Sequence, residues 1–419
     1  MAAEARSHQI AAMLRREALT IAAVVMLAVV AIGGVGYFSE AREDGSTALF
    51  GNDYASFYAA GRLALEGHPE AAYDLESHSA MQRRVVAEAK PGGRLEATYY
   101  FGYPPTYQAL LAPFALLPYY PSLFLFLGST AILYIVALWQ IWPGWRTVLY
   151  GLAVPGACIA FGFGQNAFLT TGLIGLALVL LDRRPILAGI LIGCLAFKPQ
   201  LGLAFPLILL ATGRWRTFGA AALTVAVTVG ASLVWPGVAA WRSFVAIAGV
   251  SRSGLLETSA VGFEKIQSLF AALRLYGASI ETAYAAQAVL TSMVAISLVI
   301  VWRSGADRRL KAASACVATL LMTPFCLAYD LLIEVPAAAF FIAYGADRGF
   351  RPGELVLIAF ALLSPEIGAT GATGSLPVGF AGMALFYLVI ARRTWTDPAA
   401  VPENDPAGRR RRGGLTGLA

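Results

Sequence analysis

The stretch DRRPILAGILIGCLAFKPQLGLAFPLILLATGRWR, residues 182–216, decides how this chain folds. Residues 185–211 are apolar except for Lys198 and Gln200, and basic turns flank them on both sides. Because basic turns of membrane proteins stay on the cytoplasmic side, both ends of the stretch lie on one face. A single helix that crosses the membrane ends on the opposite face, so one crossing does not fit this stretch. We therefore expect two half-length helices that meet at Lys198-Pro199-Gln200, an arrangement tolerated where broken helices line a protein cavity.

The rest of the chain also has the composition of a membrane protein. Its 419 residues are 58% hydrophobic and 13% charged, with a mean hydropathy of +0.66. Soluble domains carry about 25% charged residues, and a spanning helix needs about 20 apolar ones. We predict an all-α polytopic fold with about 11–12 membrane segments, including the broken pair near 198–200. The first span is expected at 18–38, and another at 147–163.

The charge of the chain gives its orientation. The net charge of +6 comes mainly from Arg and Lys in short loops and tails on one side, which the positive-inside rule makes cytoplasmic. This distribution explains the charge without a nucleic-acid partner. Residues 1–395 are predicted to form one transmembrane domain, followed by a basic, disordered cytoplasmic tail at 396–419. Both termini are expected in the cytoplasm.

Two longer loops fall on the opposite, outer side. The first, residues 39–103, is predicted to hold two amphipathic helices. One runs from Asn52 or Asp53 to Glu66, before the helix-stopping Gly67, and the other covers 75–90. The second outer loop covers 236–282.

Polar side chains gather on this outer side at four points of the sequence. Buried or cavity-facing polar groups are costly in a membrane and therefore mark functional sites. Because all four fall on one face of the predicted topology, we expect a single extracytoplasmic site. The four points are the segment from Asp53 to Arg62, Gln165-Asn166, Lys198 to Gln200, and Tyr329-Asp330.

Asp53 and Lys198 have the side chains that best suit catalysis. A carboxylate beside apolar surface gains affinity for protons and suits a general base, so Asp53 is the expected catalytic residue; a helix cap is the alternative. All three histidines precede residue 79, which leaves carboxylates as the proton acceptors of the later spans. Lys198 suits a phosphate group as a point charge, and snorkelling to the interface is its alternative.

Other residues are candidates for substrate binding, each with a structural alternative. Gln165 and Asn166 either hydrogen-bond a hydroxylated substrate or close a turn, and Asp330 either faces the site or caps the next helix. Arg252 and Lys265 in the second outer loop either reach a phosphate or stay solvated. The four cysteines lie in apolar segments without a CxxC pair, so no metal site is expected. The expected substrate-binding residues are Tyr54, Tyr58, Arg62, Tyr103, Gln165, Asn166, Lys198, Gln200, Arg252, Lys265 and Asp330.

Five stretches, in order, carry a resemblance to a known family. The chain resembles glycosyltransferase family 87, the polyprenyl-phosphate-mannose-dependent α-1,2-mannosyltransferase-like membrane enzymes of bacteria, which have a GT-C fold. The stretches are DYASFYAAGRLALEGHPEAAYD (53–74), FGYPPTYQALLAPFALLP (101–118), GQNAFLTTGLIGLAL (164–178), KPQLGLAFPLILL (198–210) and TPFCLAYDLLI (323–333).

The resemblance implies an inverting transfer of a sugar, mannose in the first instance, at the extracytoplasmic face of the bacterial inner membrane. A polyprenyl-phosphate-linked donor would supply the sugar and a lipid or glycan hydroxyl would accept it, with Asp53 as general base. No cofactor or metal is implied, and the partners are the donor, the acceptor and membrane lipids. A secondary transporter is the first alternative, since transporters also use broken helices. A lipid-linked glycan ligase or polymerase is the second.

Overall fold

The computed structural model describes residues 20, 23–27, 49–90, 99–258, 262–369 and 377–397. Within this part the elements are helical, apart from one isolated β-bridge between Ile266 and Leu327. The prediction of an all-α polytopic fold is therefore confirmed. Most of the predicted first span at 18–38, and the tail from residue 398 onward, lie outside the described residues.

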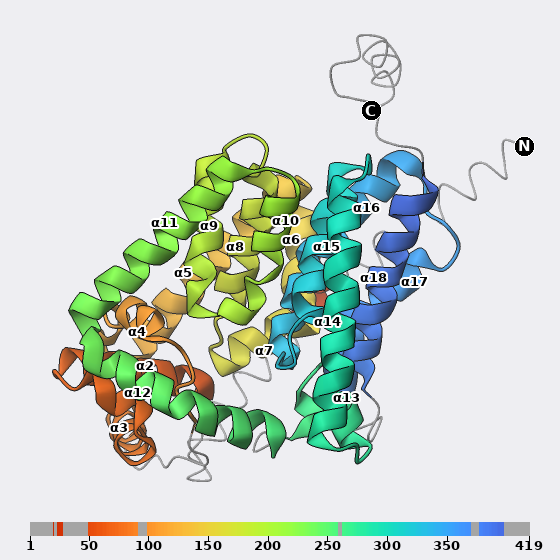
Figure 1. Cartoon of the computed structure of the whole chain (residues 1–419). Coiled ribbons are helices and arrows are strands. Elements are labelled where there is room, and N and C mark those ends of the chain that lie inside the picture. Colours follow the sequence, from red (N-terminus) through yellow and green to blue (C-terminus); the bar gives the residue numbers. More distant parts are fainter. Residues whose placement is uncertain are drawn as a thin grey trace, which may run out of the picture.

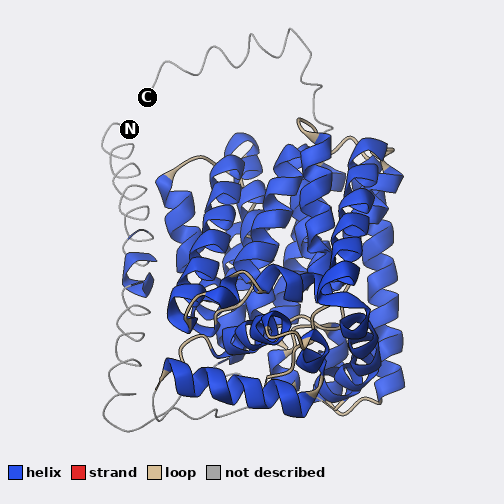
Figure 2. Cartoon of the chain, turned by 90° about the vertical axis from the view of Figure 1, so that its left-hand side faces the viewer, coloured by secondary structure: helices blue, strands red, loops and turns tan. Residues whose placement is uncertain are grey.

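The described helices form an upright bundle whose lower end is covered by the elements of the two outer loops (Figures 1 and 2). The elements of the two predicted outer loops are α2 (Asn52–Leu65), η1 (Pro69–Tyr73), α3 (Leu75–Ala89), α12 (Val238–Ser251), η6 (Arg252–Glu257), η7 (Phe263–Lys265) and α13 (Leu269–Leu275). Three elements adjoin these loops in the sequence: α4 (Pro105–Leu111), η2 (Phe114–Leu116) and η5 (Leu233–Gly237). The bundle contains α5 (Tyr119–Ile141), α6 (Trp145–Ala153), α7 (Pro155–Phe163), α8 (Ala167–Leu180), α9 (Pro185–Cys194), η3 (Leu195–Phe197), η4 (Pro199–Leu201), α10 (Ala204–Ala211), α11 (Trp215–Ser232), α14 (Ile280–Arg303), α15 (Arg308–Leu321), η8 (Ala328–Ile333), α16 (Glu334–Arg348), α17 (Glu354–Ala369) and α18 (Val378–Thr396).

Among the described residues, four helices are long and apolar enough to cross a membrane. The pair α6 and α7 makes a fifth if it is counted as one span, although the two helices are bent by 65°. The predicted span at 147–163 is thus broken, because Pro155 disfavours a helical conformation at Val154. The four long helices are Tyr119–Ile141, Trp215–Gly249, Ile280–Arg303 and Ala328–Arg348, and the shorter apolar helices of 10–17 residues are Ala167–Leu180, Pro185–Phe197, Pro199–Ala211 and Glu354–Ser364.

The stretch 182–216 forms the broken pair that its flanking charges predict. One arm, α9 with η3, ends at Phe197, and the other, η4 with α10, begins at Pro199. The pair as a whole therefore begins, at Pro185, and finishes, at Ala211, at the same end of the bundle. An ion pair of 2.6 Å between Arg214 and Asp182 joins the two flanking turns directly.

Basic residues lie in or beside the turns at this end of the bundle, the upper end in Figure 1, and we call it the basic end. It holds the turns at 142–144, 181–184, 212–214, 304–307 and 349–353. Ion pairs connect several of them, including the 2.7 Å contact between Arg309 and Asp347. The opposite end, where the outer-loop helices lie, is called the site end.

Small residues hold the first arm of the broken pair against α11. Gly189 and Gly193, four residues apart in α9, both face that helix. A Cβ at Gly193 would lie 2.5 Å from the Cβ of Thr224 and 2.7 Å from the carbonyl oxygen of Ala221. Such spacing of small residues lets two backbones approach closely in a membrane bundle. It fixes the position of the arm that leads to Lys198.

We expect Gly193→Ala to destabilise the protein by about 1–3 kcal/mol, since the added methyl group forces α9 away from α11. The matched control is Gly219→Ala in α11, where nothing lies within 4 Å of an added Cβ. That substitution should be neutral or should stabilise the helix by up to about 1 kcal/mol. Thermal unfolding in detergent measures both, and equal midpoints for the two variants would contradict the packing described.

Candidate functional site

Two glycines allow the first outer-loop helix to touch the turn before α8. Gly164 has a φ of +70°, and a Cβ there would lie 2.6 Å from the Cβ of Tyr54. Gly51 has a φ of +79° and donates its N–H to the carbonyl of Gly162 at 3.2 Å. Glycine adopts such left-handed conformations without steric cost. This close approach places the start of α2 beside Gln165 and Asn166.

Asp53 lies in the first turn of α2, but its side chain does not cap the helix. The N-cap residue is Gly51, and no side-chain bond caps this end. The Asp53 carboxylate instead accepts a hydrogen bond from Nε2 of Gln165, 112 residues further along the chain. The side chain is therefore directed at the turn between α7 and α8, which disagrees with the capping interpretation of this residue.

The surroundings of Asp53 make it a stronger base than an ordinary aspartate. Burial raises the pKa of Asp53 from 3.8 to about 6, while the hydrogen bond from Gln165 and the charges of Lys198 and Lys265 lower it. A carboxyl group with a pKa near 6 is still ionised at neutral pH. It also holds a proton more firmly, and both properties suit general base catalysis.

A buried ion pair lies next to this carboxylate. Nζ of Lys198 is 2.5 Å from Oδ1 of Asp330, and the two side chains are 6% and 2% exposed. Lys198 also donates to Oδ1 of Asn166 at 3.3 Å, and Oδ2 of Asp330 accepts the Leu327 N–H at 3.1 Å. Lys198 is thus buried, which excludes snorkelling. Asp330 both pairs with Lys198 and holds the start of η8.

Tyrosine rings surround the Lys198 ammonium. Nζ lies 5.2 Å from the ring centroid of Tyr329 and 6.0 Å from that of Tyr103. Tyr107 packs against Tyr103, with ring centroids 4.7 Å apart. Among the described residues, Oη of Tyr107 and Nδ2 of Asn166 are buried without a hydrogen-bond partner. A buried donor left unpaired costs about 1–3 kcal/mol, so these groups favour a ligand rich in hydroxyl groups.

The second outer loop reaches the site through a short backbone pairing. Ile266 and Leu327 form the isolated bridge, and Gln267 donates its N–H to the carbonyl of Cys326 at 2.6 Å. Oγ of Ser268 donates to the carbonyl of Pro324 at 2.7 Å. The exposed Lys265 is thereby held near enough to Asp53 for its charge to lower the pKa of that carboxyl group.

Two predicted aromatic residues are used for packing. Tyr54 is fully buried, and its hydroxyl bonds to Oγ of Ser122 at 2.6 Å. The hydroxyl of Tyr58 donates to the carbonyl of Leu117 at 2.7 Å. In this structure both side chains face the interior between α2 and the start of α5.

The remaining predicted residues lie apart from the cluster or outside the described side chains. Arg62 forms ion pairs with Glu66 at 3.5 Å and Glu88 at 3.4 Å on the surface of the first outer loop. Gln200 is half-buried beyond the break at Lys198. Arg252 begins η6, and its side chain lies outside the described part of the structure.

Sequence reasoning missed one acid, Glu334, and one tyrosine, Tyr107, as site residues. Glu334 is fully buried one turn after Asp330, and within the described part of the chain neither carboxyl oxygen has a hydrogen-bond partner. The sequence feature that indicates Glu334 is the presence of an acid inside the apolar run LLIEVPAAAFF (331–341). Tyr107 had no distinguishing feature in the sequence, because tyrosines are common at membrane boundaries.

Fold and site together define a class of protein. Broken apolar helices and outer-loop elements bring a carboxylate, an ammonium group and unpaired hydrogen-bond donors to one end of a membrane bundle. This arrangement suits an enzyme that acts on a polar group attached to a lipid.

The model of glycosyltransferase family 87 matches residues 100–324, more than half of the chain. The protein belongs to this family and is a glycosyltransferase. The matched range includes Gln165, Asn166 and Lys198, whereas Asp53 precedes it and Asp330 follows it. Comparisons with curated proteins and with solved structures found no match.

The ion pair between Lys198 and Asp330 predicts that a single variant and a double variant differ in stability. Lys198→Met leaves the Asp330 carboxylate buried without its partner, and breaking such a pair costs about 3–5 kcal/mol. The double variant Lys198→Met, Asp330→Asn removes both charges and keeps an oxygen that accepts the Leu327 N–H. We expect it to be more stable than the single variant.

Denaturant or thermal unfolding of the two variants in detergent measures this difference. The wild-type protein and the single Asp330→Asn variant complete the thermodynamic cycle. A double variant less stable than Lys198→Met alone would show that the pair is not the main interaction of these two side chains.

Proposed function

We propose that this protein transfers mannose, with inversion, from a polyprenyl-phosphate-linked donor to a hydroxyl group of a lipid or glycan acceptor. Membership of the family supports glycosyl transfer. The observation that carries the specific proposal is the carboxylate of Asp53, which has a raised pKa and faces a cluster containing a buried lysine. The basic residues of the opposite end support an extracytoplasmic position for the site.

In the proposed reaction Asp53 is the general base. It removes the proton of the acceptor hydroxyl while that oxygen attacks the anomeric carbon from the side opposite the phosphate. The bond between the anomeric carbon and the phosphate oxygen breaks, and its electron pair leaves with the lipid phosphate. The proton remains on Asp53 and is then released to water, so that one base serves each turnover.

Two lysines are proposed to stabilise the departing phosphate. Lys265 is exposed at the edge of the site, and its charge is not offset by an ion pair among the described residues. Lys198 is buried deeper, and its charge is shared with Asp330 and Asn166. Cations already in place where negative charge develops lower the barrier without reorganisation. Lys265 therefore suits direct contact with the phosphate, and Lys198 suits orientation of the polar groups beneath it.

The hydrocarbon part of the donor requires access from the membrane. The break at Lys198 stands at the site end of two short apolar arms, α9 with η3 and η4 with α10, whose neighbours α11 and α14 expose apolar residues. We propose that the isoprenoid chain lies along this part of the bundle, with its phosphate at the level of Lys198.

Asp53→Asn is expected to lower the rate of sugar transfer by about 10²–10⁴-fold, because the amide cannot take the proton of the acceptor. The assay measures transfer from a polyprenyl-phosphate-linked mannose to extracted membrane glycolipids in proteoliposomes. Glu76→Gln removes an exposed acid of the same outer loop and should retain wild-type activity. A fully active Asp53→Asn protein would exclude Asp53 as the base.

The pH dependence of kcat/KM is a second, independent test of Asp53 as the general base. The base must be ionised, so activity should fall about tenfold per pH unit below a midpoint near the pKa of about 6. The hydrogen bond from Gln165 lowers this pKa. Gln165→Leu should therefore move the midpoint to higher pH, whereas Gln140→Leu, at an exposed position of α5 near the basic end, should leave it unchanged. An unshifted midpoint in Gln165→Leu would contradict the role of this hydrogen bond.

A further inference from the structure

A pocket of about 430 Å³ opens at the basic end of the bundle. Helix α2, which carries Asp53, lies at the opposite end (Figure 1). The pocket lies where the turn between α8 and α9 meets the turn between α10 and α11. Its volume falls within the range of about 300–1,000 Å³ that is usual for ligand sites. The lining residues are Leu181, Asp182, Pro185, Gly213, Arg214, Trp215, Arg216 and Thr217.

Positive charge exceeds negative charge in this pocket. Asp182 is the one acid of the lining, and it is already paired with Arg214 at 2.6 Å. Nε of Arg214 is buried and has no hydrogen-bond partner among the described residues. Arg216 is exposed and forms no ion pair within the described part of the chain. Lys311 adds a further cation near Arg214.

Two helices begin at the pocket, which adds to the positive potential. The first residue of α9 is Pro185 and that of α11 is Trp215, and neither helix has a side-chain cap. The first turn of a helix has unpaired N–H groups and the equivalent of about half a positive charge, so it attracts anions. Here two such ends adjoin the same two arginines.

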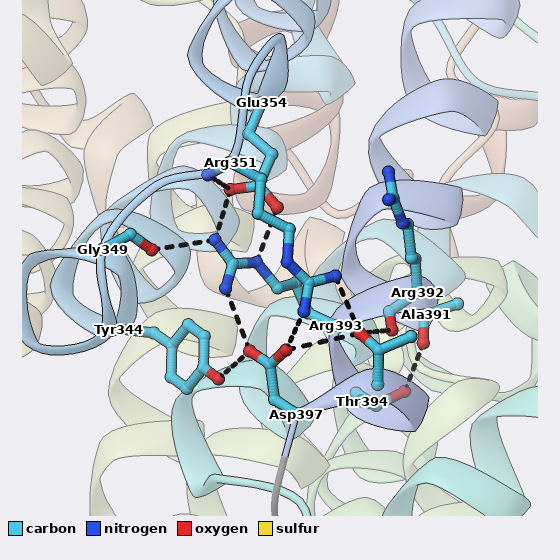
Figure 3. Close-up of polar contacts among 10 residues, drawn as sticks. Tyr344, Gly349, Arg351, Glu354, Ala391, Arg392, Arg393, Thr394 and Asp397 are labelled. Carbon is cyan, nitrogen blue, oxygen red and sulfur yellow. Dashed lines mark hydrogen bonds and ion pairs between the residues drawn. The ribbon is translucent and has the colours of Figure 1, made fainter.

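In the other half of the basic end, two arginines are paired with acids of the same half. Arg393 is 3% exposed and donates to both carboxylate oxygens of Glu354 at 2.6 Å, and Arg351 pairs with Asp397 (Figure 3). Tyr344 also bonds to Asp397. Arg393 and Arg351 thus each have an acid as partner, whereas Arg216 of the pocket has none among the described residues. An external anion would complete the pocket.

Tryptophans place the pocket at the level of lipid headgroups. Trp145, Trp215 and Trp395 all lie at the basic end and are 58%, 64% and 66% exposed. Exposed tryptophans gather at the boundary between the hydrocarbon and the headgroups of a bilayer. Trp215 is itself part of the lining. A phosphate of the adjoining leaflet therefore lies within reach of the arginines.

We propose that this pocket binds the phosphate group of an anionic phospholipid in the leaflet at the basic end. Arg214 and Arg216 contact the phosphate, the first turns of α9 and α11 donate N–H groups to it, and Trp215 packs against the glycerol backbone and acyl chains. Basic pockets between spanning helices are suited to such headgroups. The site is separate from sugar transfer, and a test of lipid binding does not depend on the activity of Asp53.

Native mass spectrometry of the full-length protein, titrated with phosphatidylglycerol or with phosphatidylcholine, tests the proposal. The wild-type protein should retain one phosphatidylglycerol with higher affinity than phosphatidylcholine. Arg216→Gln should weaken the binding of phosphatidylglycerol about fivefold, the effect expected for one basic residue near a lipid phosphate. Arg216 is exposed and in no ion pair of the described structure, so this variant should fold; Arg214→Gln is the second variant.

Arg392→Gln is the matched control, since it removes one exposed positive charge from the other half of the same end. It should bind phosphatidylglycerol as the wild type does. Equal affinities of wild type and Arg216→Gln, or equal losses in Arg216→Gln and Arg392→Gln, would overturn the proposed site.

A titration with inorganic phosphate tests whether the ligand of the pocket is a lipid phosphate or a free anion. In phosphatidylcholine nanodiscs, millimolar phosphate should not raise the thermal unfolding midpoint of the wild-type protein, whereas added phosphatidylglycerol should raise it. An equal increase with inorganic phosphate, lost in Arg216→Gln, would assign the pocket to a soluble anion and overturn the lipid proposal.

Discussion

The ion pair between Lys198 and Asp330 is the interaction on which the site end depends. It joins the break between η3 and η4 to the break between α15 and α16, two irregular segments separated by 132 residues. Two charges buried at 6% and 2% exposure are stable only when they are paired and their remaining hydrogen-bonding groups are satisfied. Asn166 and the Leu327 N–H supply those additional bonds. The interaction and its accompanying bonds thus hold three chain segments together, those around Asn166, Lys198 and Asp330.

The two ends of the bundle use charge differently because they have different tasks. At the site end, polar groups are few and buried, and some of them lack partners within the described residues, as Oη of Tyr107 and Nδ2 of Asn166 do. At the basic end, charges are numerous, and half of that end pairs them internally through Arg393 and Glu354. Unpaired buried groups destabilise the free protein. They can persist where a ligand satisfies them, which is typical of functional sites.

Much of this architecture could be predicted from the sequence, for identifiable reasons. The broken pair followed from basic turns on both sides of an apolar stretch, and the helix from Asn52 followed from the stops after it. The partners of individual side chains could not be predicted. The sequence around Asp53 does not show that its carboxylate accepts a hydrogen bond from Gln165 instead of capping α2. This hydrogen bond forms only because the left-handed Gly51 and Gly164 allow α2 to approach the turn before α8. Tyr54 and Tyr58 lie close to Asp53 in the sequence, but their positions on helix α2 place their side chains in the protein interior.

The position of Asp53 at a helix start explains how one residue satisfies two opposing demands. Burial raises the pKa of the carboxyl group, which strengthens it as a base but favours its protonated form. The Gln165 amide and the charges of Lys198 and Lys265 act in the opposite direction and keep the pKa at about 6. The helix N-terminus adds a favourable field for the ionised form. Gln165 and Lys198 come from other segments, so the base acquires its strength only when the turn before α8 and the broken pair are in place.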